Sequence, residues 1–286
     1  MRKVIFRVLL AVFIALFVVS GFFIGKYLYD SKKAESVFND FSATLQEIIN
    51  AYETGPENRP PGQTANSGPG AGEATGSSAP EGSGEYETGA VVTDPRLLAY
   101  RDMNLMYPDM VGRIKIPGTV VDYPVMYTPN DPEYYLDHDI DKAYSSHGAP
   151  FLDFKCDIER PSDNLIIYAH HMKDGSMFAC LNRYKNKSFL EEHPTVEFHT
   201  LYDIGYYEVV AIFVSHIGAD GKYAFEYFLY TDFGGRGEFD DFMDLVREYR
   251  LYDSGTEAVY GDRLLSLSTC DYTGSNSRMV LLARKI

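Results

Sequence analysis

The pattern of apolar and polar residues divides the chain into four parts. Residues 8–24 (VLLAVFIALFVVSGFFI) carry no charge, and with their apolar flanks they approach the about 20 residues that cross a bilayer as a helix. Residues 34–52 place apolar side chains at helical spacing, which predicts an amphipathic helix. The stripe consists of Val37, Phe38, Phe41, Leu45, Ile48, Ile49 and Tyr52. The pattern leaves open whether this stripe packs on the main domain, a partner or the membrane surface.

The apolar run has two possible interpretations, a cleaved signal peptide or a permanent anchor. The run is long and no small-residue cleavage site follows it, which favours an uncleaved anchor over residues 1–30. Basic residues lie on both sides of the run, so orientation rests mainly on the shortness of the leading segment. We expect the N-terminus in the cytoplasm and residues 31–53 as a juxtamembrane helix.

Residues 54–92 are rich in Gly, Pro, Ser and Thr and almost lack large apolar side chains. Such a segment cannot bury enough surface to fold, so the composition predicts a disordered linker. A flexible coil of this length spans roughly 35 Å on average. We therefore expect a tether that separates the membrane from the folded domain, and truncation near residue 92 should remove nothing structural.

Residues 93–286 have the pattern of a mainly β domain. Asp94 and Pro95 predict the start of a helix that continues to about Tyr107, and an apolar face predicts a second helix over 238–252. The predicted strands are 111–116, 120–127, 164–169, 195–200, 206–217, 263–270 and 278–285. Many short strands with few helices indicate a closed or partly closed β-barrel.

Composition excludes several function classes. The net charge of −15 disfavours nucleic acid, because phosphate binding needs clustered Lys and Arg. The three cysteines, Cys156, Cys180 and Cys270, have no metal-ligand spacing, so we expect no metal, and nothing calls for a cofactor. An odd number of cysteines leaves at least one thiol free. Cys156 and Cys180 are interpreted as buried small hydrophobic residues.

Three residues have the types that a cysteine-dependent acyl transfer needs. Cys270 ends an apolar strand, where a rigid scaffold presents a side chain to solvent. Arg278 begins the next strand, so an antiparallel return would place it near the thiol. His170 and His171 follow the strand NLIIYA, and strand alternation lets only one of them face the thiol. Each residue also has a plain interpretation, as a semi-buried thiol, a surface cation or a solvated loop histidine.

Longer segments of residues 97–286 resemble class B sortases, the cysteine transpeptidases of Gram-positive cell surfaces. The resemblance is carried by DMVGRIKIPGTVVDYPVMY, PEYYLDHDI, GAPFLDFKC, NLIIYAHHMKDGSMFACLNRYKN and LLSLSTCDYTGSNSRMVLLARKI. It implies a sortase-type closed barrel of about eight strands with flanking helices. Residue by residue it implies that His170, Cys270 and Arg278 are catalytic, and that Ser268 and Thr269 contact substrate.

The sequence departs from the family pattern at two positions. Ala169 stands where Gly usually precedes the histidine, and Arg113 stands where Trp is usual. Neither departure removes a catalytic group.

The resemblance also implies substrates and location. The expected partners are surface proteins with a C-terminal sorting motif, and an amine of a cell-wall peptidoglycan precursor or a pilin subunit as acceptor. The expected location is the cell membrane, with a single span and an extracellular catalytic domain. Two alternatives use the same sequence features, a cysteine endopeptidase with water as acceptor and a non-catalytic tethered surface-binding domain.

Overall fold

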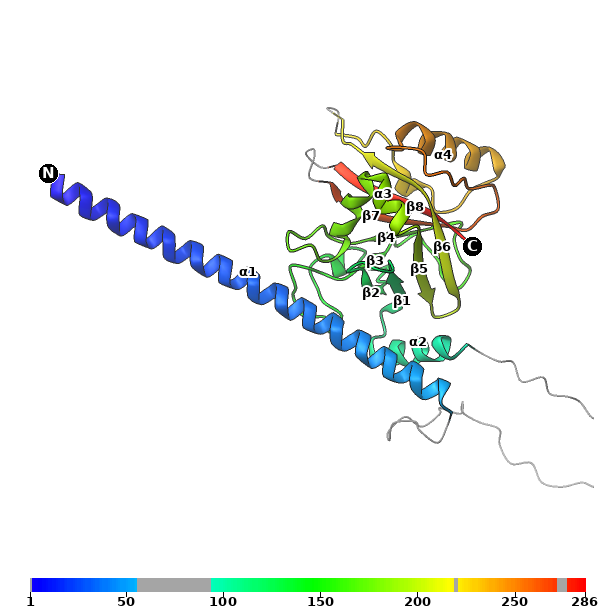
Figure 1. Ribbon diagram of the computed structural model, residues 1–286, viewed down its shortest axis with the longest axis horizontal. Coiled ribbons are helices and arrows are strands. Elements are labelled where there is room, and N and C mark those ends of the chain that lie inside the picture. Colours follow the sequence, from blue (N-terminus) through cyan, green and yellow to red (C-terminus); the bar gives the residue numbers. More distant parts are fainter. Residues whose placement is uncertain (1, 56–93, 219–220, 272–276) are drawn as a thin grey trace, which may run out of the picture.

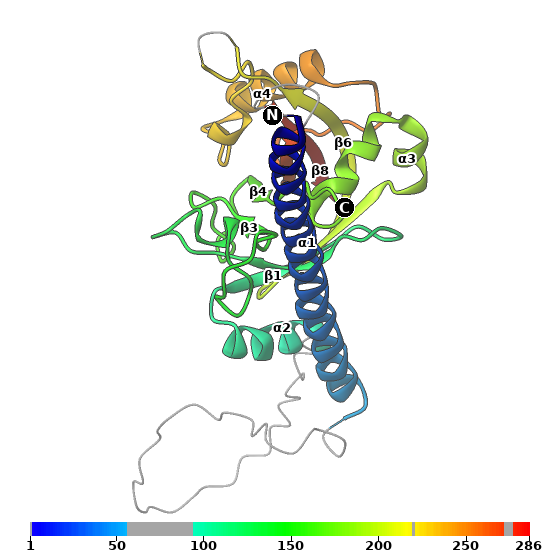
Figure 2. The same ribbon diagram turned by 90° about the vertical axis from the view of Figure 1, so that its left-hand side faces the viewer.

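The computed structural model describes residues 2–55, 94–218, 221–271 and 277–286. It forms a β-barrel with helices at its sides and one long N-terminal helix that extends far beyond it (Figures 1 and 2). Nearly all of the predicted linker, residues 56–92, lies outside the described residues.

Within the described residues, eight strands close the barrel in the order β1-β2-β3-β4-β7-β8-β6-β5. Their bounds are β1 Met110–Lys115, β2 Asp122–Met126, β3 Phe151–Leu152, β4 Asn164–Tyr168, β5 Thr195–Thr200, β6 Ile204–Ser215, β7 Leu264–Asp271 and β8 Ser277–Lys285. Neighbouring strands run antiparallel except for two parallel pairs, β2 with β3 and β4 with β7. The prediction of a mainly β, closed, eight-stranded barrel is confirmed.

Sequence patterns located seven of these strands, and they missed β3. That strand has only two residues, too few to show alternation, and it is a strand because it bridges β2 and β4. The sequence also gave no signal for the 3₁₀ helix η3 Phe178–Lys185 and the short helix α3 Lys187–Glu192. The predicted helices appear as α2 Pro95–Met106, capped by Asp94, and α4 Arg236–Tyr249. Two further 3₁₀ turns are η2 Tyr134–Leu136 and η4 Tyr227–Leu229.

Helix α1, Arg2–Glu53, is continuous from the apolar run through the amphipathic segment. Its N-terminal part is long and apolar enough to cross a membrane, and none of the side chains described there is buried. Its C-terminal part packs on α2 and β2, so the packing partner that the sequence left open is the barrel domain. The ring of Phe38 meets Tyr123 edge to face at 4.9 Å, and the Tyr52 hydroxyl donates to Asp102 at 2.7 Å. The buried positions are Ala34, Phe38, Phe41, Leu45, Ile48 and Ile49.

This packing changes the interpretation of the chain between α1 and α2. Because α1 contacts the barrel domain directly, the apolar run is joined to the barrel through α1 itself. The expectation of a spacer between membrane and domain is therefore not supported. Truncation near residue 92 would also remove the stripe of α1 from the hydrophobic core, so the expectation that it removes nothing structural is wrong.

Candidate active site

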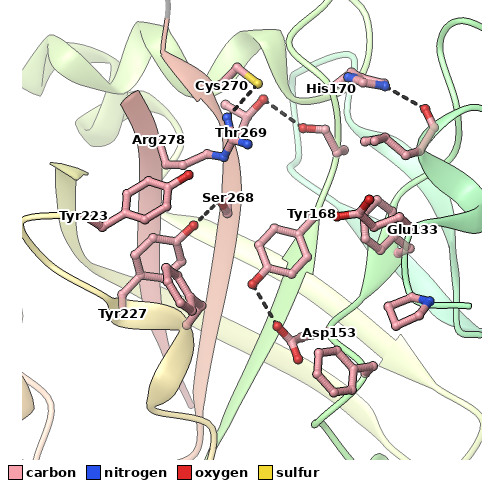
Figure 3. Close-up of a pocket in the computed structure, with 16 residues that line it drawn as sticks. Glu133, Asp153, Tyr168, His170, Tyr223, Tyr227, Ser268, Thr269, Cys270 and Arg278 are labelled. Carbon is pink, nitrogen blue, oxygen red and sulfur yellow. Dashed lines mark hydrogen bonds between the residues drawn. The ribbon is translucent and has the colours of Figure 1, made fainter. Parts of the chain in front are cut away.

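The thiol of Cys270 and the guanidinium of Arg278 meet at one end of the barrel. Strands β7 and β8 pair antiparallel with Cys270 directly opposite Arg278. Arg278 Nη1 lies 3.1 Å from Cys270 Sγ and donates to it (Figure 3). A cationic donor at this distance stabilises negative charge on the sulfur. The short connection between two paired strands thus brings the two side chains together, as the sequence predicts.

The histidines reach the same end through the parallel pair of β4 and β7. In this pair Tyr168 lies opposite Ser268. One residue further, the Ala169 amide donates to the Ser268 carbonyl at 3.2 Å, and the Thr269 hydroxyl donates to the Ala169 carbonyl at 2.9 Å. Register with β7 therefore continues past the end of β4, and it carries His170 to the level of Cys270.

The two adjacent histidines have different surroundings. His170 lines the same pocket as Cys270 and Arg278, and its Nε2 donates to the Leu136 carbonyl at 2.7 Å. In the neutral form of the ring, a proton on Nε2 leaves the lone pair on Nδ1. His171 is not among the pocket residues; its Nδ1 lies 3.1 Å from the Cys270 carbonyl oxygen and 2.6 Å from Asn182 Nδ2. Both rings are thus near Cys270, and His170 shares the pocket with its thiol.

A cavity of about 410 Å³ extends from this group along the barrel wall. Figure 3 shows Cys270 and His170 at one end and Asp153 at the other, with Tyr168 and Tyr227 between them. The remaining lining residues are Pro132, Glu133, Leu136, Phe151, Phe154, Ala169, Tyr223, Phe228, Ser268, Thr269 and Arg278. A lining of aromatic faces with a few polar groups is typical of ligand-binding pockets.

Internal hydrogen bonds fix the polar groups of this pocket. The Tyr168 hydroxyl donates to Asp153 at 2.8 Å, and the Tyr227 and Ser268 hydroxyls are 2.7 Å apart. Burial raises the pKa of both tyrosines, so their hydroxyls stay protonated. The hydroxyls of Ser268 and Thr269, which the resemblance suggested as substrate contacts, therefore line the pocket and are engaged within the protein.

The other two cysteines have a different environment. All three thiols are free, but Cys156 and Cys180 are buried, whereas Cys270 is partly accessible. Burial raises the pKa of Cys156 to about 12 and that of Cys180 to about 11, which keeps both protonated and unreactive. Among the residues that the structure describes, no cluster of His, Cys, Asp and Glu could hold a metal ion.

Sequence reasoning missed several groups of this site. The Leu136 carbonyl is a backbone atom, which no pattern of side chains reveals. Tyr168 could have been found, since it lies two residues before His170 on the same strand face. Tyr227 comes from η4, where the sequence gave no strand or helix signal. The unusual Arg113 is accommodated by a bidentate pair with Asp122, with both distances 2.6 Å.

A barrel that holds a thiol against a guanidinium, with an imidazole at the end of the adjacent strand, has the groups of a cysteine-dependent acyl-transfer enzyme. No family model matches the chain. The chain is 36% identical over 171 residues to sortase B of Listeria monocytogenes, covering 60% of this chain and 66% of that protein, just under two thirds of its length.

Solved structures of sortase B also match the chain. A structure of sortase B from Listeria monocytogenes matches with 33% identity and a TM-score of 0.56, over 64% of this chain and 98% of that one. A Staphylococcus aureus sortase B–substrate complex matches with 28% identity and a TM-score of 0.60, over 66% and 85%. The chain therefore belongs to the class B sortases, which are cysteine transpeptidases that process sorting signals. The alternatives of an endopeptidase and a non-catalytic binding domain are not favoured.

Proposed function

We propose that Cys270 is the nucleophile of this transpeptidase, His170 its general acid and base, and Arg278 the group that stabilises the oxyanion. The observation that carries the proposal is the 3.1 Å contact between Arg278 Nη1 and Cys270 Sγ in the pocket that His170 also lines. His171 is assigned no catalytic role, because its ring contacts the Cys270 backbone and Asn182 outside that pocket.

The reaction has two stages. Cys270 gives its thiol proton to His170, and its Sγ attacks the carbonyl carbon of a peptide bond while Arg278 donates to the oxygen as it becomes negative. The carbon–nitrogen bond breaks, the leaving amine takes a proton from His170, and a thioester remains. An incoming amine then attacks the thioester and gives its proton to His170. The new amide leaves, and His170 returns the proton to the sulfur, which restores the thiol.

The substrate side of the proposal is a surface protein with a sorting motif near its C-terminus, whose motif residues lie along the cavity toward Asp153. The acceptor is an amine of a peptidoglycan precursor or of a pilin subunit. Support for a small glycine-type amine comes from a similar structure, a sortase B complexed with triglycine, at 27% identity and a TM-score of 0.60 over 66% of this chain and 86% of that one.

The proposed location is the cell membrane, with one span and the barrel on the extracellular face. The apolar, unburied N-terminal part of α1 supports an anchor within residues 1–30. We further propose residues 31–53 as the juxtamembrane part of α1, residues 54–92 as a disordered linker between α1 and α2, and residues 93–286 as the catalytic domain.

The test is mass spectrometry of products from the full chain in detergent, incubated with a library of sorting-type pentapeptides and triglycine. We expect a peptide–triglycine product and a thioester on Cys270, both absent in Cys270→Ala. His170→Ala should abolish turnover, whereas His171→Ala should keep much of it. If His171→Ala is the inactive variant, the assignment of the base is wrong. If only hydrolysed peptide forms at saturating triglycine, the acceptor assignment is wrong.

A further inference from the structure

Two segments of the chain hold His170, one through its backbone and one through its imidazole, and neither is part of a barrel strand. The first is the hairpin that follows it, in which the Phe178 amide donates to the His170 carbonyl at 2.9 Å and His171 pairs with Met177. The second is the loop that carries Leu136, whose carbonyl accepts the His170 Nε2 proton. The orientation of His170 therefore depends on where these two segments lie.

Asp174 fixes the tip of the hairpin. Its Oδ1 accepts hydrogen bonds from the amide and the hydroxyl of Ser176, at 3.0 and 2.6 Å. Its Oδ2 accepts from His147 Nε2 at 2.8 Å and from the Ser31 hydroxyl at 2.6 Å. Burial would raise the pKa of Asp174, but these hydrogen bonds outweigh it and hold the pKa well below its usual range. Asp174 is thus a charged acceptor shared by three parts of the chain.

The Leu136 loop is tied to the same hairpin and is tightly built. His147, which bonds Asp174, belongs to this loop and is 1% exposed. The next residue, Gly148, has φ of +60°, and a Cβ there would lie 2.6 Å from the Leu136 oxygen. Asp139 in the same loop is buried, and its Oδ1 accepts the amides of Asp141 and Ala143. Its Oδ2 faces Lys33 Nζ at 3.6 Å.

Helix α1 therefore reaches both segments that hold His170, through Ser31 to the hairpin and through Lys33 to the Leu136 loop. These residues lie just after the apolar run, on the helix that the membrane would hold. Van der Waals packing alone does not require either contact, since Ser31 and Lys33 are outside the buried stripe.

We propose that Ser31 and Lys33 are positioning residues for His170, so that the membrane helix forms part of the catalytic apparatus of this enzyme. The inference rests on the proposed role of His170 as the acid and base. Without the two contacts the fold remains, but the hairpin and the Leu136 loop gain freedom and the imidazole spends less time aligned with the thiol. A misplacement of about 1 Å in a reacting group can lower a rate by as much as about 100-fold.

The test uses the full chain in detergent micelles with the double variant Ser31→Ala/Lys33→Ala. The matched control is Ser42→Ala/Lys32→Ala, which changes the same residue types on α1. The structure describes no hydrogen bond or ion pair for the side chains of Ser42 and Lys32. The measurements are kcat and KM for transpeptidation, the melting temperature, and the rate of Cys270 alkylation by iodoacetamide against pH.

We expect kcat to fall about 10-fold in the double variant, on the scale set for a misplaced group, with KM changed less than about twofold. The pH profile of alkylation should shift toward that of His170→Ala, because the imidazole is aligned with the thiol for less of the time. The conservative variant Ser31→Thr/Lys33→Arg keeps the hydroxyl and the charge, so it should restore kcat and the profile.

Three outcomes would overturn the inference: a double variant with the kcat and alkylation profile of the control, a conservative variant as slow as the double variant, or a fall in kcat with an unchanged profile. If instead His170→Ala keeps its turnover, the proposed function fails, which is a distinct result. Asp174→Asn tests the same hydrogen bonds from the barrel domain. It should lower kcat and shift the pH profile of alkylation in the same direction as the double variant.

Discussion

Replacement of Phe41 by Ala tests whether α1 is part of the folded domain. Phe41 is 1% exposed, and its ring lies 6.2 Å from that of Tyr107. Truncation of a buried Phe to Ala costs about 3–5 kcal/mol, as lost transfer free energy and as a cavity. For a domain of this size each kcal/mol lowers the melting temperature by about 2–4 °C, so we expect a decrease of about 10 °C.

The measurement is thermal unfolding of the full chain in detergent, followed by circular dichroism. Glu47→Ala is the control, because Glu47 is exposed on the same helix and Ala keeps helix propensity. We expect the control to melt with the wild type. Equal melting temperatures for Phe41→Ala and the wild type would refute the reasoning, since a buried ring cannot be removed without cost. A chain truncated at residue 92 should melt lower still, whereas truncation at residue 30 should melt normally.

Three further predictions concern the site and the electrostatics. Arg278→Ala should lower kcat about 10²–10³-fold, the usual effect of losing an oxyanion donor, with little change in melting temperature. Arg278→Lys should also be slow, because lysine lacks the planar guanidinium. A near-normal kcat in Arg278→Ala would show that Arg278 does not stabilise the oxyanion. Iodoacetamide should modify Cys270 in the folded protein and spare Cys156 and Cys180, because burial raises the pKa values of these two thiols to about 12 and 11. Comparable labelling of all three cysteines, measured by peptide mass spectrometry, would contradict this prediction. Burial, aided by the charges of Arg96 and Arg113, lowers the pKa of His199 to about 4. As the pH falls, His199 is protonated in the unfolded chain before it is protonated in the folded protein, so the free energy of unfolding should fall by about 3 kcal/mol between pH 6.5 and 4. Urea unfolding of His199→Phe should show a smaller fall than the wild type over the same pH range.

The strands could be predicted because their signals are local. β4, β7 and β8 are each a short apolar run that ends in turn residues, and this pattern can be recognised without knowing which strands lie beside them. β3 and η3 have no such pattern, because contacts with other parts of the barrel decide their conformation. The apolar stripe of α1 could also be predicted from the sequence. An apolar stripe indicates only that something covers it, so the structure was needed to identify the barrel domain as its partner.

The site could be predicted in part for similar reasons. Arg278 follows Cys270 after a short connection, so antiparallel pairing brings them together by local geometry. His170 lies 100 residues before Cys270, and only the parallel register of β4 with β7 makes them neighbours, so the family resemblance was needed. The groups that hold His170 in place, such as the Leu136 carbonyl and Asp174, depend on loop conformation, which side-chain patterns do not encode.

The parallel pairing of β4 with β7 also sets the order in which the enzyme becomes active. Its partners are 100 residues apart, and Cys270 and Arg278 lie in strands near the C-terminus of the chain. A pairing of such long range forms late and slowly, after local hairpins and helices. During synthesis α1 is therefore complete long before β7, and His170 meets the Cys270 thiol only after β7 has joined the sheet. With α1 as the membrane anchor that we propose, a nascent chain can reach the membrane before its active site has formed.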